Sequence, residues 1–269
     1  MNRTYAFVVA VFCLFPLVSP ASTAEDLRPV VERVRERLTR SFADLETFMS
    51  RGAKELAALG IEGADARKVL SETCTANANI IDCAIVNPAG TMILVEPEAY
   101  KGHEGVSIKE QAQIRKVLET KKPVLSDLFV PVEGGYSVDL EYPVLSGDGT
   151  FLGSLSALLR VDGMVRDAIS NEAKDAGCIV WVMQKDGVIV YDPDPNQINR
   201  NIFEDDLFKP FDRLLDFARE VAGRESGVGG YGFYAAGLGD PELVKKAAAW
   251  DTFSFGGAEW RIIAARIER

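Results

Sequence analysis

The first part of the chain repeats apolar residues with a helical period. Between residues 27 and 59 apolar side chains recur at steps of three and four, and charged side chains occupy the other positions. This pattern predicts one long amphipathic helix with a single buried stripe, which ends at Gly60. A second helix is expected over residues 64–73. The stripe consists of Leu27, Val31, Val34, Leu38, Phe42, Leu45, Met49, Leu56 and Leu59.

After residue 76 the pattern changes to short apolar runs separated by Gly, Pro, Asn and Asp, which is typical of strands and turns. One round of strands and helices is followed by a second with the same plan, and glycine turns at Gly90 and Gly187 occupy matching places. The repetition predicts an α+β fold with two lobes after the long helix. Strands are expected over 80–86, 91–95, 125–130, 136–144, 151–159, 178–183, 188–191, 227–234, 246–253 and 259–267, and helices over 108–118, 163–174 and 207–221.

The N-terminus has the pattern of a secretory signal peptide. Arg3 provides a positive start, residues 6–18 form an apolar run, and the small residues Ser22, Thr23 and Ala24 follow Pro20. We expect cleavage after Ala24 and a secreted or periplasmic mature protein. The alternative is an uncleaved anchor, which the shortness of the apolar run disfavours.

Charge and cysteine content narrow the picture further. The 269 residues include 40 acidic and 30 basic side chains, a net charge of −10 that argues against binding nucleic acid. Cys13 leaves with the signal peptide, so Cys74, Cys83 and Cys178 remain. Cys74 and Cys83 are the candidate disulfide in an oxidising compartment, and three buried thiols are the alternative.

The residues that would indicate catalysis or a cofactor are missing from the sequence. His103 is the only histidine, which excludes a zinc site with two histidines. No nucleophile elbow, phosphate-binding loop or Cys-x-x-Cys pair occurs, so we expect neither an enzyme nor a cofactor. The acidic run 192–196 contains two prolines and lacks the spacing of a calcium loop, so a turn is the better interpretation. Trp181, Trp250 and Trp260 are expected to be core aromatics of the second lobe.

Several motifs, in order, resemble those of one family. They are Asn87-Pro88-Ala89-Gly90, then Lys122 to Asp127, then Tyr142-Pro143-Val144 followed by residues 147–153, then Asp186 to Pro195, and finally residues 249–260. Their order and spacing resemble the double Cache (dCache) extracytoplasmic sensor domains, in a free-standing secreted form. The resemblance implies two PAS-like lobes, each an antiparallel sheet with flanking helices. The expected division is a signal peptide over 1–24, a helical region over 25–76, a distal lobe over 77–162 and a proximal lobe over 163–269.

The resemblance also implies a small organic ligand, bound in the distal lobe between the sheet and its cover. Here the segment from Ile108 to Val144 occupies that place. Tyr136 and Tyr142 share one face of a predicted strand with Val138 and Leu140, and would line the pocket if that face points inward. Packing of these tyrosines in the core is the alternative. The candidate ligand-binding residues are Gln111, Gln113, Arg115, Phe129, Tyr136, Asp139 and Tyr142.

The sequence departs from the family pattern at two points. Members that bind amino acids carry an Arg and a Trp-Tyr pair near the cover helix and an Asp after the hairpin, where this chain has residues 110–114 and Leu158. The resemblance therefore does not support an α-amino-acid ligand. Family members normally continue into a membrane helix and a signalling domain, whereas this sequence ends at Arg269. We therefore expect a separate membrane receptor or kinase as the partner in signal transduction or chemotaxis.

Two alternatives to this role remain. The long helix could serve as a protein-interaction module that docks on a receptor or forms a homodimer. A transport-associated solute-binding protein is the other alternative, which the antiparallel pattern disfavours.

Overall fold

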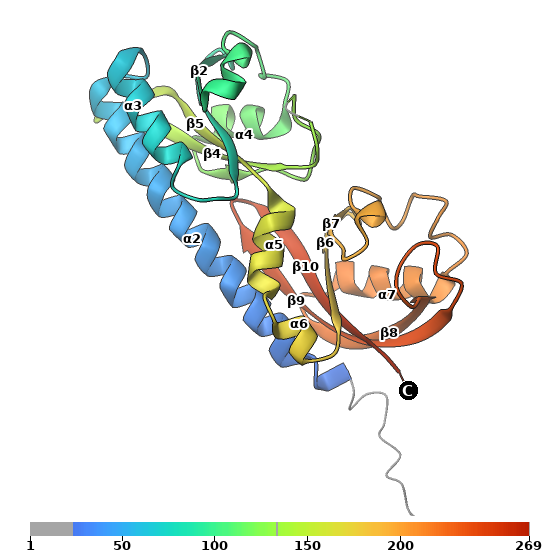
Figure 1. Ribbon diagram of the computed structural model, residues 1–269. Coiled ribbons are helices and arrows are strands. Elements are labelled where there is room, and N and C mark those ends of the chain that lie inside the picture. The colour runs from blue at the N-terminus through green and yellow to red at the C-terminus, as the bar shows by residue number, and fades with distance from the viewer. Residues whose placement is uncertain (1–23, 133, 269) are drawn as a thin grey trace, which may run out of the picture.

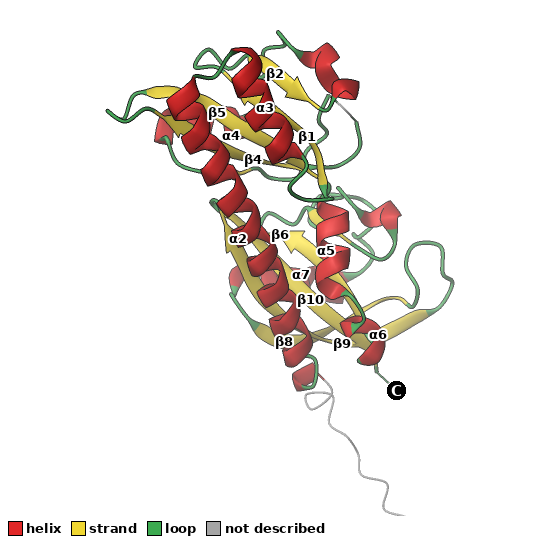
Figure 2. Ribbon diagram, turned by 60° about the vertical axis from the view of Figure 1, so that its left-hand side comes forward, coloured by secondary structure: helices red, strands yellow, loops and turns green. Residues whose placement is uncertain are grey.

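Two sheets lie one above the other along a single long helix (Figures 1 and 2). The computed structural model describes residues 24–132 and 134–268. The predicted signal peptide lies outside this range, except for Ala24. Among the described residues, no helix combines the length and the apolar character needed to cross a membrane.

The long helix α2 (Arg28–Leu59) holds the two lobes together. Pro29 suits its first turn, where a missing N–H costs no hydrogen bond, and Gly60 ends it with a positive φ of 93°. The predicted stripe is buried from Leu27 to Leu56, where it packs on strands of both sheets. Leu59 is the exception, because the last turn extends beyond the sheet and leaves this side chain 55% exposed.

The distal lobe is an antiparallel sheet with strand order β2-β1-β5-β4-β3. The second helix α3 lies beside α2, and the helices η1 and α4 belong to the cover on the opposite face of the sheet (Figure 1). Its elements are α3 (Gly63–Cys74), β1 (Ile80–Val86), β2 (Met92–Glu96), η1 (Glu98–His103), α4 (Ala112–Thr120), β3 (Val124–Leu125), β4 (Val138–Leu145) and β5 (Phe151–Leu159).

The proximal lobe repeats this plan with strand order β7-β6-β10-β9-β8. Replacing each strand by its counterpart in the first round gives the same order in both sheets, which confirms the predicted α+β fold with two similar lobes. Its elements are α5 (Val161–Ile169), α6 (Glu172–Asp175), β6 (Ile179–Gln184), β7 (Ile189–Tyr191), η2 (Pro195–Gln197), α7 (Asp212–Gly223), β8 (Gly227–Tyr234), β9 (Leu243–Phe255) and β10 (Ala258–Ile267).

Four predicted element boundaries were wrong. The strand expected over 125–130 ends at Leu125, and the next begins at Val138, because the chain between them turns to cover the sheet. The helix expected from Ile108 starts at Ala112, since the Ile108 N–H donates instead to the Gly90 carbonyl. The helix over 163–174 is interrupted at Ser170, which has a φ of 46°, and the helix expected from residue 207 begins at Asp212.

The two lobes also contact each other directly. The Leu125 N–H donates to the Gly256 carbonyl in the β9–β10 turn at 3.0 Å. The Leu128 N–H donates to Gln184 Oε1, at the end of β6, at 2.6 Å. Both contacts come from the segment that follows α4, so the cover of the distal lobe rests on the proximal lobe.

Candidate functional site

The distal lobe contains a cavity of about 30 Å³ between its sheet and its cover. This volume is room for about two to three water molecules. Strands β1, β4 and β5 form the floor, and the segments around Ile108 and Pro131 form the cover. The lining consists of Asp82, Ala84, Met92, Ile108, Gln111, Phe129, Pro131, Val132, Asp139, Ser156 and Leu158. The only charged side chains in this lining are the carboxylates of Asp82 and Asp139.

Asp139 is the centre of the polar contacts in this cavity. It is 3% exposed, and its Oδ1 accepts a hydrogen bond from the Ser156 hydroxyl at 2.7 Å. Its Oδ2 accepts from Gln113 Nε2 at 3.3 Å, and that amide also donates to Gln111 Oε1 at 2.7 Å. The Asp139 N–H donates to the Ser126 hydroxyl at 2.8 Å. These contacts fix the carboxylate relative to the cover helix and to β5.

Four of the seven predicted site residues come together here. Gln111, Phe129 and Asp139 line the cavity, and Gln113 is buried behind them on α4. These four residues come from the cover and from the strand that the sequence proposed as the two sides of the site, and their role in binding a ligand remains a prediction.

Three predicted site residues lie elsewhere. Tyr142 points to the opposite face of β4 and packs beside α2, because Val138 and Leu140 on that face belong to the core under the long helix. Tyr136 precedes β4 and is 44% exposed. The Arg115 side chain is 61% exposed and pairs with Glu110 at 3.4 Å. The face of β4 that lines the cavity is therefore the one with Asp139, and not the one with the tyrosines.

Sequence reasoning missed Asp82 on β1 and Ser156 on β5. Leu158 on β5 is paired with Asp82 on β1 and with Asp139 on β4. The two carboxylates therefore flank the position of Leu158 from the two neighbouring strands. The signal available in the sequence was a charged residue within an apolar strand, at Asp82 and again at Asp139. Only the register shows that the two residues share a face.

A third acidic residue, Glu141, lies on the same face of β4, at the position paired with Ser156. It is fully buried, next to the side chains of Asp139, Ser154 and Ser156. Burial raises the pKa of Glu141 well above its ordinary value, and the nearby Asp139 carboxylate raises it further. Glu141 therefore favours its protonated, uncharged form, and the negative charge of the cavity lining comes from Asp82 and Asp139.

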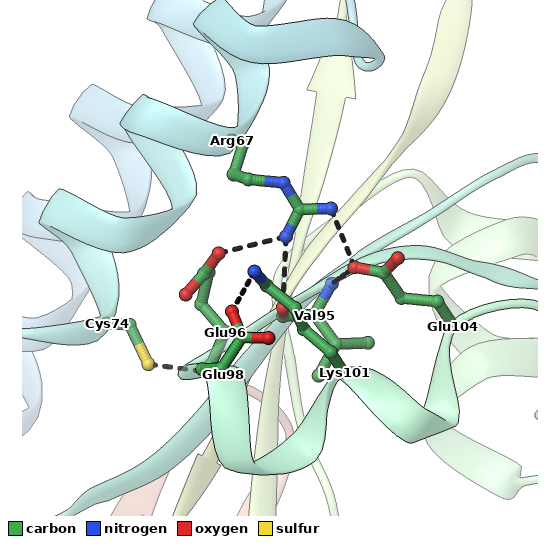
Figure 3. A network of polar contacts seen from close by, with 7 residues as sticks. All are labelled: Arg67, Cys74, Val95, Glu96, Glu98, Lys101 and Glu104. Atoms are coloured by element: carbon green, nitrogen blue, oxygen red, sulfur yellow. Dashed lines mark hydrogen bonds and ion pairs between the residues drawn. The ribbon is translucent and has the colours of Figure 1, made fainter.

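The cover is attached to α3 by a network around Arg67 (Figure 3). Arg67 Nη1 donates to Glu96 Oε1 at 2.9 Å, and Nη2 donates to Glu104 Oε1 at 2.8 Å. Glu104 also accepts from the Val95 N–H at 3.0 Å, and the hydrogen bond from Arg67 is the main reason that the pKa of Glu104 is lowered. The network connects α3, the end of β2 and the segment after η1.

Cys74 and Cys83 are neighbours in space, and both are free thiols in the structure. A hydrogen bond between the two side chains is the main reason that the pKa of Cys74 is lowered. Burial raises the pKa of Cys83 well above its ordinary value. Cys74 Sγ lies 3.3 Å from the Glu96 carbonyl oxygen, next to the Arg67 network (Figure 3). The predicted disulfide remains a prediction.

No group of three or more His, Cys, Asp or Glu side chains that could hold a metal ion occurs in the described parts of the chain. In the acidic run 192–196, the Asp194 carboxylate accepts a hydrogen bond from the Asn196 N–H and caps η2. The run therefore forms the turn that the prolines predicted.

Sequence comparison connects part of the chain with a sensor family. Residues 40–161 match the family described as the sensor domain of HK/GC/chemotaxis-like proteins. The matched segment comprises most of α2 and the whole distal lobe. No curated protein matches the sequence.

Structural comparison finds similar solved structures for most of the chain. An extracellular ligand binding receptor from Desulfohalobium retbaense DSM5692 is 27% identical, with a TM-score of 0.73 over 88% of this chain and 39% of that one. The ligand binding domain of the Pseudomonas aeruginosa PAO1 amino acid chemoreceptor PctB, in complex with L-Arg, is 12% identical, with a TM-score of 0.67 over 91% of this chain and 94% of that one. The ligand-binding domain of the Pseudomonas fluorescens chemoreceptor CtaA, in complex with L-leucine, is 10% identical, with a TM-score of 0.65 over 91% and 95%. The chain therefore spans well under half of the first of these proteins and nearly all of the other two domains.

Proposed function

Because the chain has the fold of a double Cache sensor domain, and residues 40–161 match the sensor family, we propose that it is an extracytoplasmic sensor that binds a small cationic ligand in its distal lobe. It acts by binding and not by catalysis. A membrane receptor or kinase outside this chain passes on the signal.

The observation that carries this proposal is the charge of the distal cavity. Its lining contains two buried carboxylates, the amide of Gln111 and the hydroxyl of Ser156, and none of the lining residues is basic. A protonated amine carries a positive charge and several N–H donors, so it is attracted to both carboxylates and can donate hydrogen bonds to their oxygens.

The class of ligand follows from the absence of a basic residue in the cavity lining. An α-amino acid also needs a group that pairs with its carboxylate, and the residue of α4 suited to this, Arg115, points to solvent. A small amine without a carboxylate meets no such requirement. The apolar part of the ligand would contact Met92, Ile108 and Phe129.

The experiment is calorimetric titration of the mature protein with methylamine, ethanolamine and propylamine, and with propanol as the neutral comparison. We expect at least one amine to bind and propanol to bind much more weakly. Asp139→Asn and Asp82→Asn should each weaken amine binding at least tenfold. Glu110→Gln is the matched control, because the Glu110 side chain is 79% exposed and lies outside the cavity lining. Equal binding of amine and propanol, or wild-type affinity in both aspartate variants, would contradict the proposal.

A further inference from the structure

The proximal lobe contains a larger cavity, of about 60 Å³, in the corresponding place between sheet and cover. This is room for about four to six water molecules, or for an organic molecule of a few heavy atoms. Strands β6, β8 and β9 provide the floor. The turn around η2, the start of α7 and the segment at residues 235–237 provide the cover.

Lys246 brings a positive charge to the floor of this cavity. The residue is only 3% exposed, and it lies on β9 at the position paired with Tyr231. Its ammonium group is 6.0 Å from the centre of the Tyr231 ring, the outer limit of a cation–π contact. Among the described residues it has no hydrogen bond and no ion pair. Burial lowers the pKa of Lys246, as expected for an ammonium group removed from water.

The carboxyl group that could balance the charge of Lys246 belongs to Asp192, but it already accepts hydrogen bonds within the turn above the cavity. Its Oδ1 accepts from the Asp194 N–H at 2.8 Å and from Gln197 Nε2 at 3.1 Å. Burial raises the pKa of Asp192 to about 7, although the Lys246 ammonium lowers it somewhat. At neutral pH a sizeable fraction of Asp192 is therefore uncharged, and it only partly balances Lys246.

A second hydrogen-bond donor faces the same space. The indole N–H of Trp181 on β6 is buried and lines the cavity, and the Tyr231 hydroxyl lies near enough to it for a weak contact. Trp181 belongs to the buried core of the proximal lobe, as predicted, and its side chain also lines the cavity. Asp194 also lines the cavity, but both of its carboxylate oxygens already accept hydrogen bonds, from Asn196 and from the Leu238 N–H. The Lys246 ammonium group and the Trp181 N–H are the donors that face the cavity, and such donors are suited to an acceptor such as a carboxylate.

The remaining walls are apolar. Trp181 and Tyr231 meet edge to face with their ring centres 6.2 Å apart, and Phe208 and Phe233 continue the aromatic wall. Asp194 connects two parts of the cover, because its Oδ2 accepts a hydrogen bond from the Leu238 N–H at 2.7 Å. Gly237 packs against Asp194 so closely that a Cβ would lie 2.7 Å from Oδ2.

We propose that this cavity is a second binding site, for a small organic monocarboxylate. The carboxylate accepts hydrogen bonds from Lys246 Nζ and the Trp181 indole N–H, and the short alkyl group lies against Tyr231 and Phe208. The two lobes thus bind ligands of opposite charge. This site does not depend on the ligand proposed for the distal lobe.

The test is calorimetric titration of the mature protein with acetate, propionate and butyrate, with propionamide as the neutral comparison. We expect propionate or butyrate to bind, and propionamide to bind at least tenfold more weakly. Lys246→Met should weaken carboxylate binding at least tenfold. This variant should fold, because methionine fills the same space without a buried charge.

Two further variants make the result specific. Lys245→Met removes an exposed lysine from the neighbouring position of β9 and should leave the affinity unchanged. Asp139→Asn, in the distal cavity, should also leave carboxylate binding unchanged, whatever its effect on amines. Equal affinities of wild type and Lys246→Met, or absence of binding by all three carboxylates at millimolar concentration, would overturn the proposal.

Discussion

Glu141 is completely buried, and its carboxyl group lies next to the Asp139 carboxylate and the hydroxyl groups of Ser154 and Ser156. Its raised pKa means that the folded protein binds a proton here more tightly than the unfolded chain does. The stabilisation from this group is therefore fully present below the ordinary pKa of glutamate and is lost as the pH rises towards the raised value. At neutral pH and above, an ionised Glu141 costs stability.

Glu141→Gln should accordingly stabilise the protein at pH 8, by about 1–3 kcal/mol, because it removes a buried charge and keeps the shape of the side chain. At pH 4 the difference should nearly vanish. Urea unfolding at both pH values measures the effect. Glu110→Gln provides the comparison, since an exposed glutamate should show no such dependence on pH. A variant less stable than the wild type at pH 8 would contradict the assignment of a raised pKa.

At the scale of elements, the Arg67 network holds the cover of the distal cavity to α3. The guanidinium group bridges the end of β2 and the segment after η1 with two hydrogen bonds to carboxylates. Such bonds contribute more than ordinary surface pairs when they are partly shielded, as here, where the Arg67 side chain is 30% exposed.

Arg67→Ala should lower the free energy of unfolding by about 1–2 kcal/mol. Amide hydrogen exchange should increase mainly in residues 92–106, because the cover loses its attachment. Arg115→Ala removes an exposed ion pair on α4 and should change neither quantity measurably. Increased exchange spread evenly over both lobes would indicate general destabilisation instead.

Cys74 at the end of α3 and Cys83 on β1 lie next to the Arg67 network, and both are free thiols. Oxidation by oxidised glutathione would form one S–S bond between Cys74 and Cys83, with loss of one hydrogen from each thiol and transfer of both to the oxidant. We expect this bond to form in the purified protein under oxidising conditions, and to stabilise the distal lobe.

Peptide mass spectrometry without reduction measures the linkage. The expected product is a crosslinked peptide pair that contains Cys74 and Cys83 and lacks Cys178. Cys178→Ser should leave its yield unchanged. Persistence of both free thiols in oxidised glutathione, or pairing with Cys178, would show that the two sulfur atoms do not react with each other.

At the scale of the whole molecule, the distal cover and the proximal sheet are connected by Gln184. Its Oε1 accepts from the Leu128 N–H, and Leu128 precedes Phe129, which lines the distal cavity. Movement of the cover on ligand binding would therefore reach the end of β6 directly. The long helix gives a second connection, because its apolar stripe packs on both sheets. A homodimer through this helix would have to use its outer, charged face.

Gln184→Ala should leave the Leu128 N–H without its acceptor and lower the stability of the protein by about 1–3 kcal/mol. It should also uncouple the lobes, so that an amine bound in the distal cavity no longer protects proximal amides from hydrogen exchange. Asp186→Ala removes a side chain that contacts the Gln184 amide, without touching Leu128, and is the comparison. Unchanged protection in Gln184→Ala would place the connection in α2 instead.

Periodicity predicted the long helix and the two rounds of strands, because each of these depends on residues close in sequence. The antiparallel sheets, in which β1 pairs with the distant β5, were expected from the family resemblance. The prediction from periodicity was wrong where contacts between residues far apart in sequence determine the backbone conformation. Residues 126–132 are as apolar as a strand, but they form part of the cavity cover. Ile108 lies before the cover helix because its N–H is bonded to the turn at Gly90.

The sequence by itself therefore determined the fold class, the acidic character and the absence of familiar catalytic motifs, since local pattern and composition suffice for these. Only the tertiary structure decided which face of β4 lines the cavity, that Asp82 and Asp139 flank the same position, and that Lys246 and Trp181 line one cavity. A side chain on a strand alternates between two faces, and the sequence does not state which face meets the long helix. Strand register across residues far apart in the chain settles that question, and with it the composition of both cavities.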